Sequence, residues 1–175
     1  RDSEFNAISV REDALVGISE KYLGKKTELV LDPTLLLDSE DYLSVTNNNV
    51  GDEPILFVYV LDSSKEKDGL INIVNEKTKL SVVKVNAPTP YVKKTGINID
   101  DCIYPPVVDW LRNLYRADFV ITDSFHGTVF SILFNKQFIA IGNAKRGMNR
   151  FTSLLKLFHL EDRLITEFNK ESIIS

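Results

Sequence analysis

The stretch FVITDSFHGTVFSILF, residues 119–134, decides the fold. Its first three residues are β-branched or aromatic, which predicts a strand over residues 119–121. The apolar run over residues 125–134 predicts a helix, and only three residues separate it from the strand. A strand that passes directly into a helix is typical of α/β proteins.

The same alternation continues on both sides of this stretch. Short apolar runs predict strands over residues 54–61, 82–85 and 138–141, and helical patterns follow over residues 63–79 and 151–158. Pro105-Pro106 suits the first turn of a further helix, whose apolar stripe is Val107, Trp110, Leu111, Leu114 and Tyr115. Residues 86–104 form a long irregular segment, typical of a functional lid or a disordered loop. We therefore expect an α/β, Rossmann-like three-layer domain with a mostly parallel sheet.

A separate pattern precedes this domain. Short strands are predicted over residues 7–10 and 28–31, with a helix between them that should stop at Gly24. The polar, turn-rich residues 47–52 then indicate a boundary or hinge. Because the chain starts with Arg1 rather than methionine, we also expect it to be a piece of a longer protein.

Composition excludes several classes of protein. The chain has 175 residues, of which 43% are hydrophobic and 26% charged, so most of it is not disordered. A net charge of -4 gives no overall basic field for nucleic acid. The single cysteine, Cys102, makes no internal disulfide, and the longest apolar run, residues 55–61, is far shorter than the roughly 20 residues of a membrane-spanning helix. We expect a soluble, cytoplasmic protein.

The charges are unevenly distributed. Residues 124–160 contain no Asp or Glu, whereas 25 acids among 175 residues predict about five there. The basic side chains of this window are Lys136, Lys145, Arg146, Arg150, Lys156, His126 and His159. The window is either a solvated basic face or an anion site at the strand ends, where open α/β sheets bind their ligands.

The junction between strand and helix offers polar groups for such a site. A helix N-terminus presents backbone N–H groups and the positive end of the helix dipole. His126 in the first turn should point outward, Gly127 permits close approach, and Thr128 adds a hydroxyl. Structural roles are equally open: capping for Ser124, helix–strand packing for Gly127, and a structural place for His126.

At these residues the chain resembles the polysaccharide pyruvyl transferase family. The run ITDSFHGTVFSI, residues 121–132, resembles its C-terminal signature, residues 9–12 and 32–36 resemble its middle segment, and residues 150–155 with Arg163-Leu164 resemble its tail. Family members are usually longer, with two Rossmann-like halves resembling a GT-B glycosyltransferase. The resemblance implies that residues 1–50 are the end of the N-terminal half with a connector, and residues 51–175 the C-terminal half.

The resemblance also implies a reaction. A pyruvyl group passes from phosphoenolpyruvate to two hydroxyls of a sugar, which forms a cyclic ketal on a bacterial surface polysaccharide or exopolysaccharide and releases phosphate. Arg11, Arg146, Arg150 and the helix N-terminus at Ser124 are then candidates to bind the anionic donor, and His126 to move the protons. No cofactor or metal is implied. The acceptor would be a lipid-linked or nucleotide-linked saccharide, and a lipid-linked one would bring the protein to the inner face of the membrane.

One position departs from the family pattern. Some branches carry arginine two residues before the histidine, where this chain has Ser124. Arg146 or Arg150 would then supply the missing charge, or this branch handles its donor differently. Arg150 could instead be a solvated helix-starting residue, and Arg11 an ion-pair partner of a neighbouring acid. We expect His159 to be a surface or capping histidine and Cys102 to be chemically idle.

Two other functions stay open on the sequence alone. A glycosyltransferase that uses a nucleotide sugar would need the same architecture and the same basic helix terminus. A non-catalytic carbohydrate-binding or scaffolding domain is the third reading, and it predicts that loss of His126 changes neither binding nor catalysis.

Overall fold

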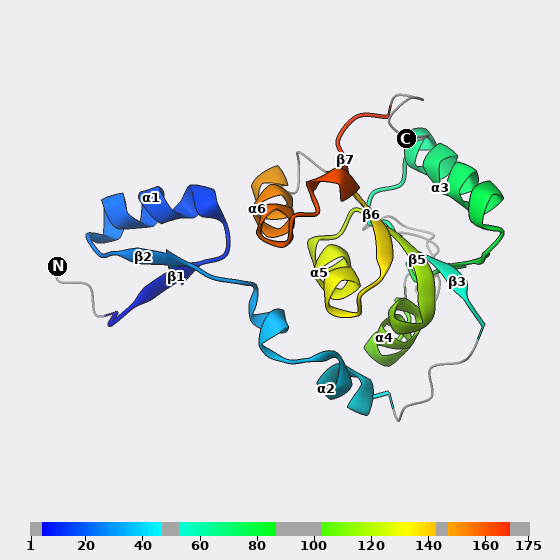
Figure 1. The fold of residues 1–175 in the computed structure, drawn as a ribbon, viewed down its shortest axis with the longest axis horizontal. Coiled ribbons are helices and arrows are strands. Elements are labelled where there is room, and N and C mark those ends of the chain that lie inside the picture. Colours follow the sequence, from blue (N-terminus) through cyan, green and yellow to red (C-terminus); the bar gives the residue numbers. More distant parts are fainter. Residues whose placement is uncertain (1–4, 47–52, 87–102, 143–146, 169–175) are drawn as a thin grey trace, which may run out of the picture.

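The N-terminal part of the chain folds as a small parallel β–α–β unit (Figure 1). The computed structural model describes residues 5–46, 53–86, 103–142 and 147–168. Strands β1 (Ile8–Val10) and β2 (Thr27–Leu29) pair in parallel, and α1 (Asp13–Leu23) connects them. The helix ends at Gly24, whose φ of 65° lies in the left-handed region, as the sequence predicts.

Two short helical segments connect this unit to the rest of the chain. The segment η1 (Pro33–Leu36) is capped by Asp32, and α2 (Ser39–Ser44) is capped by Asp38. Neither segment was expected from the sequence. The predicted boundary at residues 47–52 lies outside the described residues, as do Arg146 and most of the long segment with Cys102.

The main body contains a five-stranded sheet in the order β4-β3-β5-β6-β7. Its strands are β3 (Ile55–Tyr59), β4 (Ser81–Lys84), β5 (Ala117–Thr122), β6 (Gln137–Ile141) and the short β7 (Leu164–Ile165). Every pair of neighbours is parallel. The predicted α/β fold with a parallel sheet is confirmed, although β7 was not expected.

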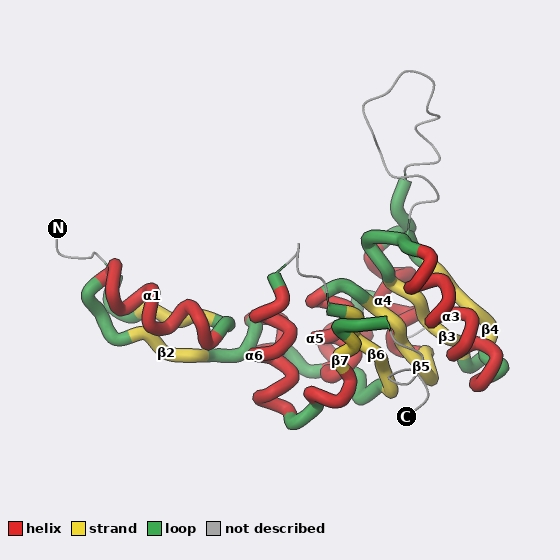
Figure 2. The backbone as a smooth tube through the Cα atoms, turned by 90° about the horizontal axis from the view of Figure 1, so that it is seen from above, coloured by secondary structure: helices red, strands yellow, loops and turns green. Residues whose placement is uncertain are grey.

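Helices cover both faces of this sheet, which makes three layers (Figures 1 and 2). Helix α3 (Lys65–Thr78) packs on one face, where Leu56 and Val58 of β3 are buried. The other face carries α4 (Val107–Arg116), α5 (Phe125–Leu133) and α6 (Met148–Phe158), followed by the short η4 (Glu161–Arg163). Both faces of β3 are therefore buried, as expected for a central parallel strand.

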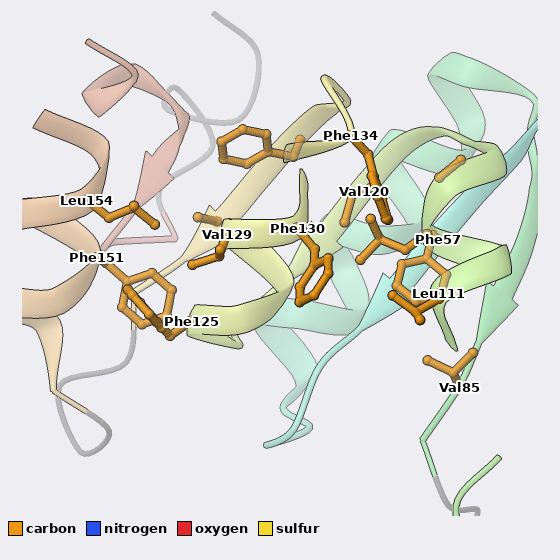
Figure 3. Close-up of a cluster of buried hydrophobic side chains, with 14 of the residues drawn as sticks. Phe57, Val85, Leu111, Val120, Phe125, Val129, Phe130, Phe134, Phe151 and Leu154 are labelled. Carbon is orange, nitrogen blue, oxygen red and sulfur yellow. The ribbon is translucent and has the colours of Figure 1, made fainter. Parts of the chain in front are cut away.

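The core on the α4–α5–α6 face is rich in aromatic rings (Figure 3). Phe57, Phe125, Phe130 and Phe151 are buried there. The predicted stripe of α4 reaches this core through Leu111 and Leu114, but Val107 in the first turn is 73% exposed. In the part of the chain that the structure describes, no helix combines the length and apolar character needed to cross a bilayer.

Helix α6 starts earlier than the sequence pattern indicates. It begins at Met148, three residues before the predicted start. Gly147 precedes it with a φ of 86°, a conformation that turns the chain into the helix and that residues other than glycine rarely adopt. This early start brings Arg150 into the first turn of α6.

Candidate active site

The predicted junction between strand and helix forms at β5 and α5. The Thr122 hydroxyl donates to the carbonyl of Tyr59 at 2.7 Å and accepts the N–H of Ser124 at 3.1 Å. Ser124 caps α5, because its Oγ accepts the N–H of Gly127 at 3.3 Å. These bonds fix the start of α5 against the carboxyl ends of β3 and β5.

Gly127 and Thr128, two predicted binding residues, make packing contacts at this junction. A Cβ at Gly127 would lie 2.3 Å from the Thr122 Oγ1, so only glycine fits against the strand. Thr128 is fully buried, and its hydroxyl donates to the carbonyl of Ser124 at 3.1 Å. A role of either residue in binding substrate stays a prediction.

Asp123 connects the junction to α3. Its carboxylate accepts the N–H of Leu61 at 2.6 Å and that of Asp62 at 3.1 Å. The Lys67 ammonium donates to the same carboxylate at 2.6 Å, and both side chains are almost completely buried. Because its oxygens bind backbone and Lys67, this carboxylate holds the loop after β3 in place rather than facing a ligand.

His126 lies in the first turn of α5, at the carboxyl edge of the sheet. Its side chain is 51% exposed, and its Nε2 atom is 4.0 Å from Oδ2 of Asp32. The imidazole also meets the Phe125 ring edge to face at 5.5 Å between centroids. The histidine that the sequence singled out therefore faces both solvent and a carboxylate from the N-terminal part of the chain.

Asp32 is the site residue that the sequence reasoning missed. Its side chain is only 2% exposed, and its Oδ2 accepts a hydrogen bond from Nη1 of Arg11. Its Oδ1 accepts two bonds from Thr34, one from the hydroxyl at 2.7 Å and one from the backbone N–H at 3.1 Å. Burial disfavours ionisation, but the bonds from Thr34 and Arg11 outweigh it and hold the pKa of Asp32 below its ordinary value.

A signal for Asp32 existed in the sequence. Arg11 and Asp32 follow β1 and β2, and the carboxyl ends of two parallel strands lie at one edge of a sheet. The approach of His126 to this edge depends on tertiary packing, and no local pattern reports it. The open alternative that Arg11 pairs with a nearby acid is confirmed.

Arg150 completes the group of charged side chains around Phe125. The Arg150 Cζ lies 5.5 Å from the centre of the Phe125 ring, and the Arg11 Cζ lies 5.0 Å from the same centre. Among the described residues, the buried Nε of Arg150 has no hydrogen-bond partner. Arg150 thus differs from Arg11, whose guanidinium is paired with Asp32.

The basic window does not form one patch. Lys136 precedes β6, at the opposite edge of the sheet from His126, and stacks over Tyr115 at 5.0 Å. Burial lowers the pKa of this lysine. Lys156 and His159 lie at the C-terminal end of α6, where His159 caps the helix with a φ of 56°, in line with its expected capping role.

The site thus contains an exposed imidazole, a buried carboxylate and two guanidinium groups. Over the described ranges, no three His, Cys, Asp or Glu side chains gather closely enough to hold a metal ion. Guanidinium groups are suited to binding an anion, and an imidazole and a carboxylate are groups that can exchange protons.

A comparison with known protein families gave a match. The family model described as polysaccharide pyruvyl transferase matches residues 2–145 of the chain. This range includes Arg11, Asp32 and the β5–α5 junction with His126, whereas Arg150 lies beyond it. A search of curated proteins found no match.

Proposed function

This chain belongs to the polysaccharide pyruvyl transferase family, and on that premise we propose that it transfers a pyruvyl group from phosphoenolpyruvate to two hydroxyls of a saccharide. The products are a cyclic ketal and inorganic phosphate. The observation that carries the proposal is the convergence of Arg11, His126 and Arg150 around Phe125 at the carboxyl edge of the sheet.

The donor requires cations because it bears a phosphate and a carboxylate. Guanidinium groups suit both, since their planar N–H donors match two oxygens at a time. Arg150 has no carboxylate partner among the described residues, and Arg11 uses Nη1 for Asp32, which leaves its other N–H donors for a ligand. Ser124 caps α5, so the missing arginine at that position is replaced in our proposal by Arg150 from α6.

The chemistry balances without any further reactant. One sugar hydroxyl adds to C2 of the enol while C3 takes up a proton and becomes a methyl group. Phosphate then leaves C2, and the second hydroxyl attacks the same carbon and loses its proton. One of the two hydroxyl protons ends on the methyl group and the other on phosphate.

We assign the proton transfers to His126. An imidazole titrates close to neutral pH, so it can accept the proton of a hydroxyl and return it to C3. Its side chain is half exposed, so a donor and an acceptor can reach it from solvent. The neighbouring Asp32 carboxylate is buried, and its Oδ2 lies 4.0 Å from Nε2 of the ring.

Two measurements on the full-length protein test this function. Phosphoenolpyruvate should raise the melting temperature, whereas stabilisation by UDP-galactose instead would favour a glycosyltransferase. With a panel of lipid-linked and nucleotide-linked saccharides, phosphate release should accompany a mass increase of the acceptor by one pyruvyl ketal. If the protein binds phosphoenolpyruvate but changes the mass of none of the lipid-linked or nucleotide-linked saccharides, it is not a pyruvyl transferase.

The variant His126→Ala tests the assignment of the protons. We expect kcat to fall by about 10²–10⁴-fold, the range for loss of a general acid or base. Because the side chain is 51% exposed, the free energy of unfolding should stay within about 0.5 kcal/mol of that of the unchanged protein. Wild-type kcat in this variant would remove His126 from the mechanism, as the reading of a non-catalytic domain predicts.

A further inference from the structure

The two oxygens of Asp32 have different partners. Oδ1 is held by the hydroxyl and the N–H of Thr34, as in an ordinary helix cap. Oδ2 faces two side chains from other parts of the chain, the guanidinium of Arg11 and the imidazole of His126. The bonds from Thr34 orient the carboxylate. In this orientation its Oδ2 points toward Arg11 and His126.

The buried carboxylate of Asp123 provides a contrast. Its partners are two backbone N–H groups and the buried Lys67, all of which belong to the framework of the fold. The partners of Asp32 Oδ2 are instead two partly exposed side chains, Arg11 at 37% and His126 at 51%. Such side chains contribute little to the core, so a buried carboxylate between them is better explained by the geometry of the site.

From these contacts we propose that Asp32 is a positioning residue, which aims the guanidinium of Arg11 and the imidazole of His126 at one bound donor. The proposal rests on the proposed function. Asp32 does not touch the reacting atoms, because its side chain is only 2% exposed and lies behind the two groups that it holds. One of five N–H donors of Arg11 is used by Asp32, so the carboxylate orients this guanidinium without occupying it.

The charge balance supports this role. Arg11 and Arg150 both stack near Phe125, and Asp32 offsets the charge of the first but not of the second. Loss of the Asp32 charge would make the site more attractive to an anion while it frees Arg11 to move. A positioning role therefore predicts that kcat falls and that the KM for phosphoenolpyruvate changes little.

The variant Asp32→Asn separates these roles with little change of shape. The amide oxygen of asparagine can keep the bonds from Thr34, since asparagine caps helices as well as aspartate does. Its NH2 group cannot accept from Arg11. We expect kcat to fall on the order of 10²-fold, as for a catalytic group displaced by about 1 Å.

The matched control is Asp38→Asn. Asp38 is also a helix cap, because its carboxylate accepts the N–H groups of Glu40 and Asp41 at the start of α2. The variant Asp38→Asn therefore removes one negative charge, as Asp32→Asn does, but changes no residue of the site. We expect unchanged kcat and KM. An equal loss of kcat in Asp38→Asn would show a general effect of charge or folding and would overturn the proposal.

A double-variant cycle tests whether Asp32 acts through Arg11. Once Arg11→Ala has removed the guanidinium, Asp32→Asn should cost much less than it does alone, because coupled residues are not additive. Fully additive losses would overturn the proposal.

A second variant, Thr34→Val, serves if Asp32→Asn does not fold. It removes the bond from the Thr34 hydroxyl to Oδ1 of Asp32 and keeps the carboxylate. A kcat below that of the unchanged protein would support the proposal, and an unchanged kcat would oppose it.

A readout without substrate keeps the two proposals distinguishable. The Arg11 side-chain N–H signals, assigned by their loss in Arg11→Ala, should report a rigid guanidinium in the full-length protein and a mobile one in Asp32→Asn. Equal mobility in both would contradict the positioning role. If the signals behave as expected while no pyruvyl transfer occurs, the proposed reaction fails and the role of Asp32 in ordering Arg11 stands.

Discussion

At the residue scale, the site places two arginines in different electrostatic surroundings. Arg11 is paired with the buried Asp32, whereas Arg150 has stacking contacts with Phe125 and Phe151 and a buried Nε without a partner among the described residues. Because no described carboxylate pairs with Arg150, its guanidinium can bind an anion without first giving up an ion pair. Arg150 is therefore our candidate for the dominant contact to the donor phosphate.

Replacement of Arg150 by alanine tests this assignment. The Kd for phosphoenolpyruvate should rise by about tenfold to a hundredfold, since a hydrogen-bonded charge pair contributes about 1.5–3 kcal/mol. Titration calorimetry measures the Kd, and Lys156→Ala is the control because it removes the same charge from the other end of α6. An unchanged Kd in Arg150→Ala would contradict the assignment. Arg150 would then not supply the positive charge that is missing at the position of Ser124.

At the element scale, the β5–α5 junction depends on framework contacts that differ from those of the site. Asp123 and Lys67 form a buried ion pair, and Asp123 also binds the backbone of the loop after β3. In Asp123→Asn the amide NH2 would face the Lys67 ammonium and a backbone N–H. We expect a loss of about 3–5 kcal/mol in the free energy of unfolding, because one buried charge loses its partner.

Urea denaturation measures this loss, and the chain offers a matched exposed pair. Arg112 and Asp109 lie 3.0 Å apart on α4 with side chains 29% and 44% exposed. Asp109→Asn should therefore cost no more than about 1 kcal/mol. A similar small cost for Asp123→Asn would mean that the pair does not organise the junction.

Elements with strong local signals could be predicted from the sequence. Pro105-Pro106 and the spacing of Leu111 and Leu114 indicate α4, and Gly24 indicates the end of α1. The segments η1, α2 and β7 are too short for a periodic pattern, and β7 exists only through its pairing with β6. The same holds for the residues of the site. His126 could be predicted because it lies in a strand–helix junction of consecutive residues, whereas Asp32 comes close to His126 only through tertiary packing.

At the scale of the whole molecule, two carboxylates connect the β1–α1–β2 unit and its connector to the main body. Asp32 faces His126 of α5. Asp13 accepts a hydrogen bond from the Ser153 hydroxyl of α6 at 2.8 Å, and its own N–H donates to the same hydroxyl at 3.2 Å. Charged carboxylates are therefore part of the contact between the N-terminal part of the chain and helices α5 and α6.

The pKa of both groups is lower in the folded protein than its ordinary value. The bond from Ser153 lowers the pKa of Asp13 most, while Asp32 is stabilised against its burial by Thr34 and Arg11. A group with a depressed folded pKa binds fewer protons when folded, so its contribution is present above its ordinary pKa near 4 and is lost as the pH falls through the folded value. Stability should thus decrease on acidification from about pH 5 to pH 3.

The double variant Asp13→Asn/Asp32→Asn tests whether these two groups account for that decrease. Because asparagine does not titrate, the difference in unfolding free energy between the unchanged protein and the double variant should be constant above about pH 5 and should shrink below it. Urea denaturation at a series of pH values measures this difference. A free-energy difference that is as large at pH 3 as at pH 7 would show that the two carboxylates have equal pKa values in the folded and unfolded chain. The contact of the N-terminal part of the chain with α5 and α6 would then depend on shape and apolar packing instead.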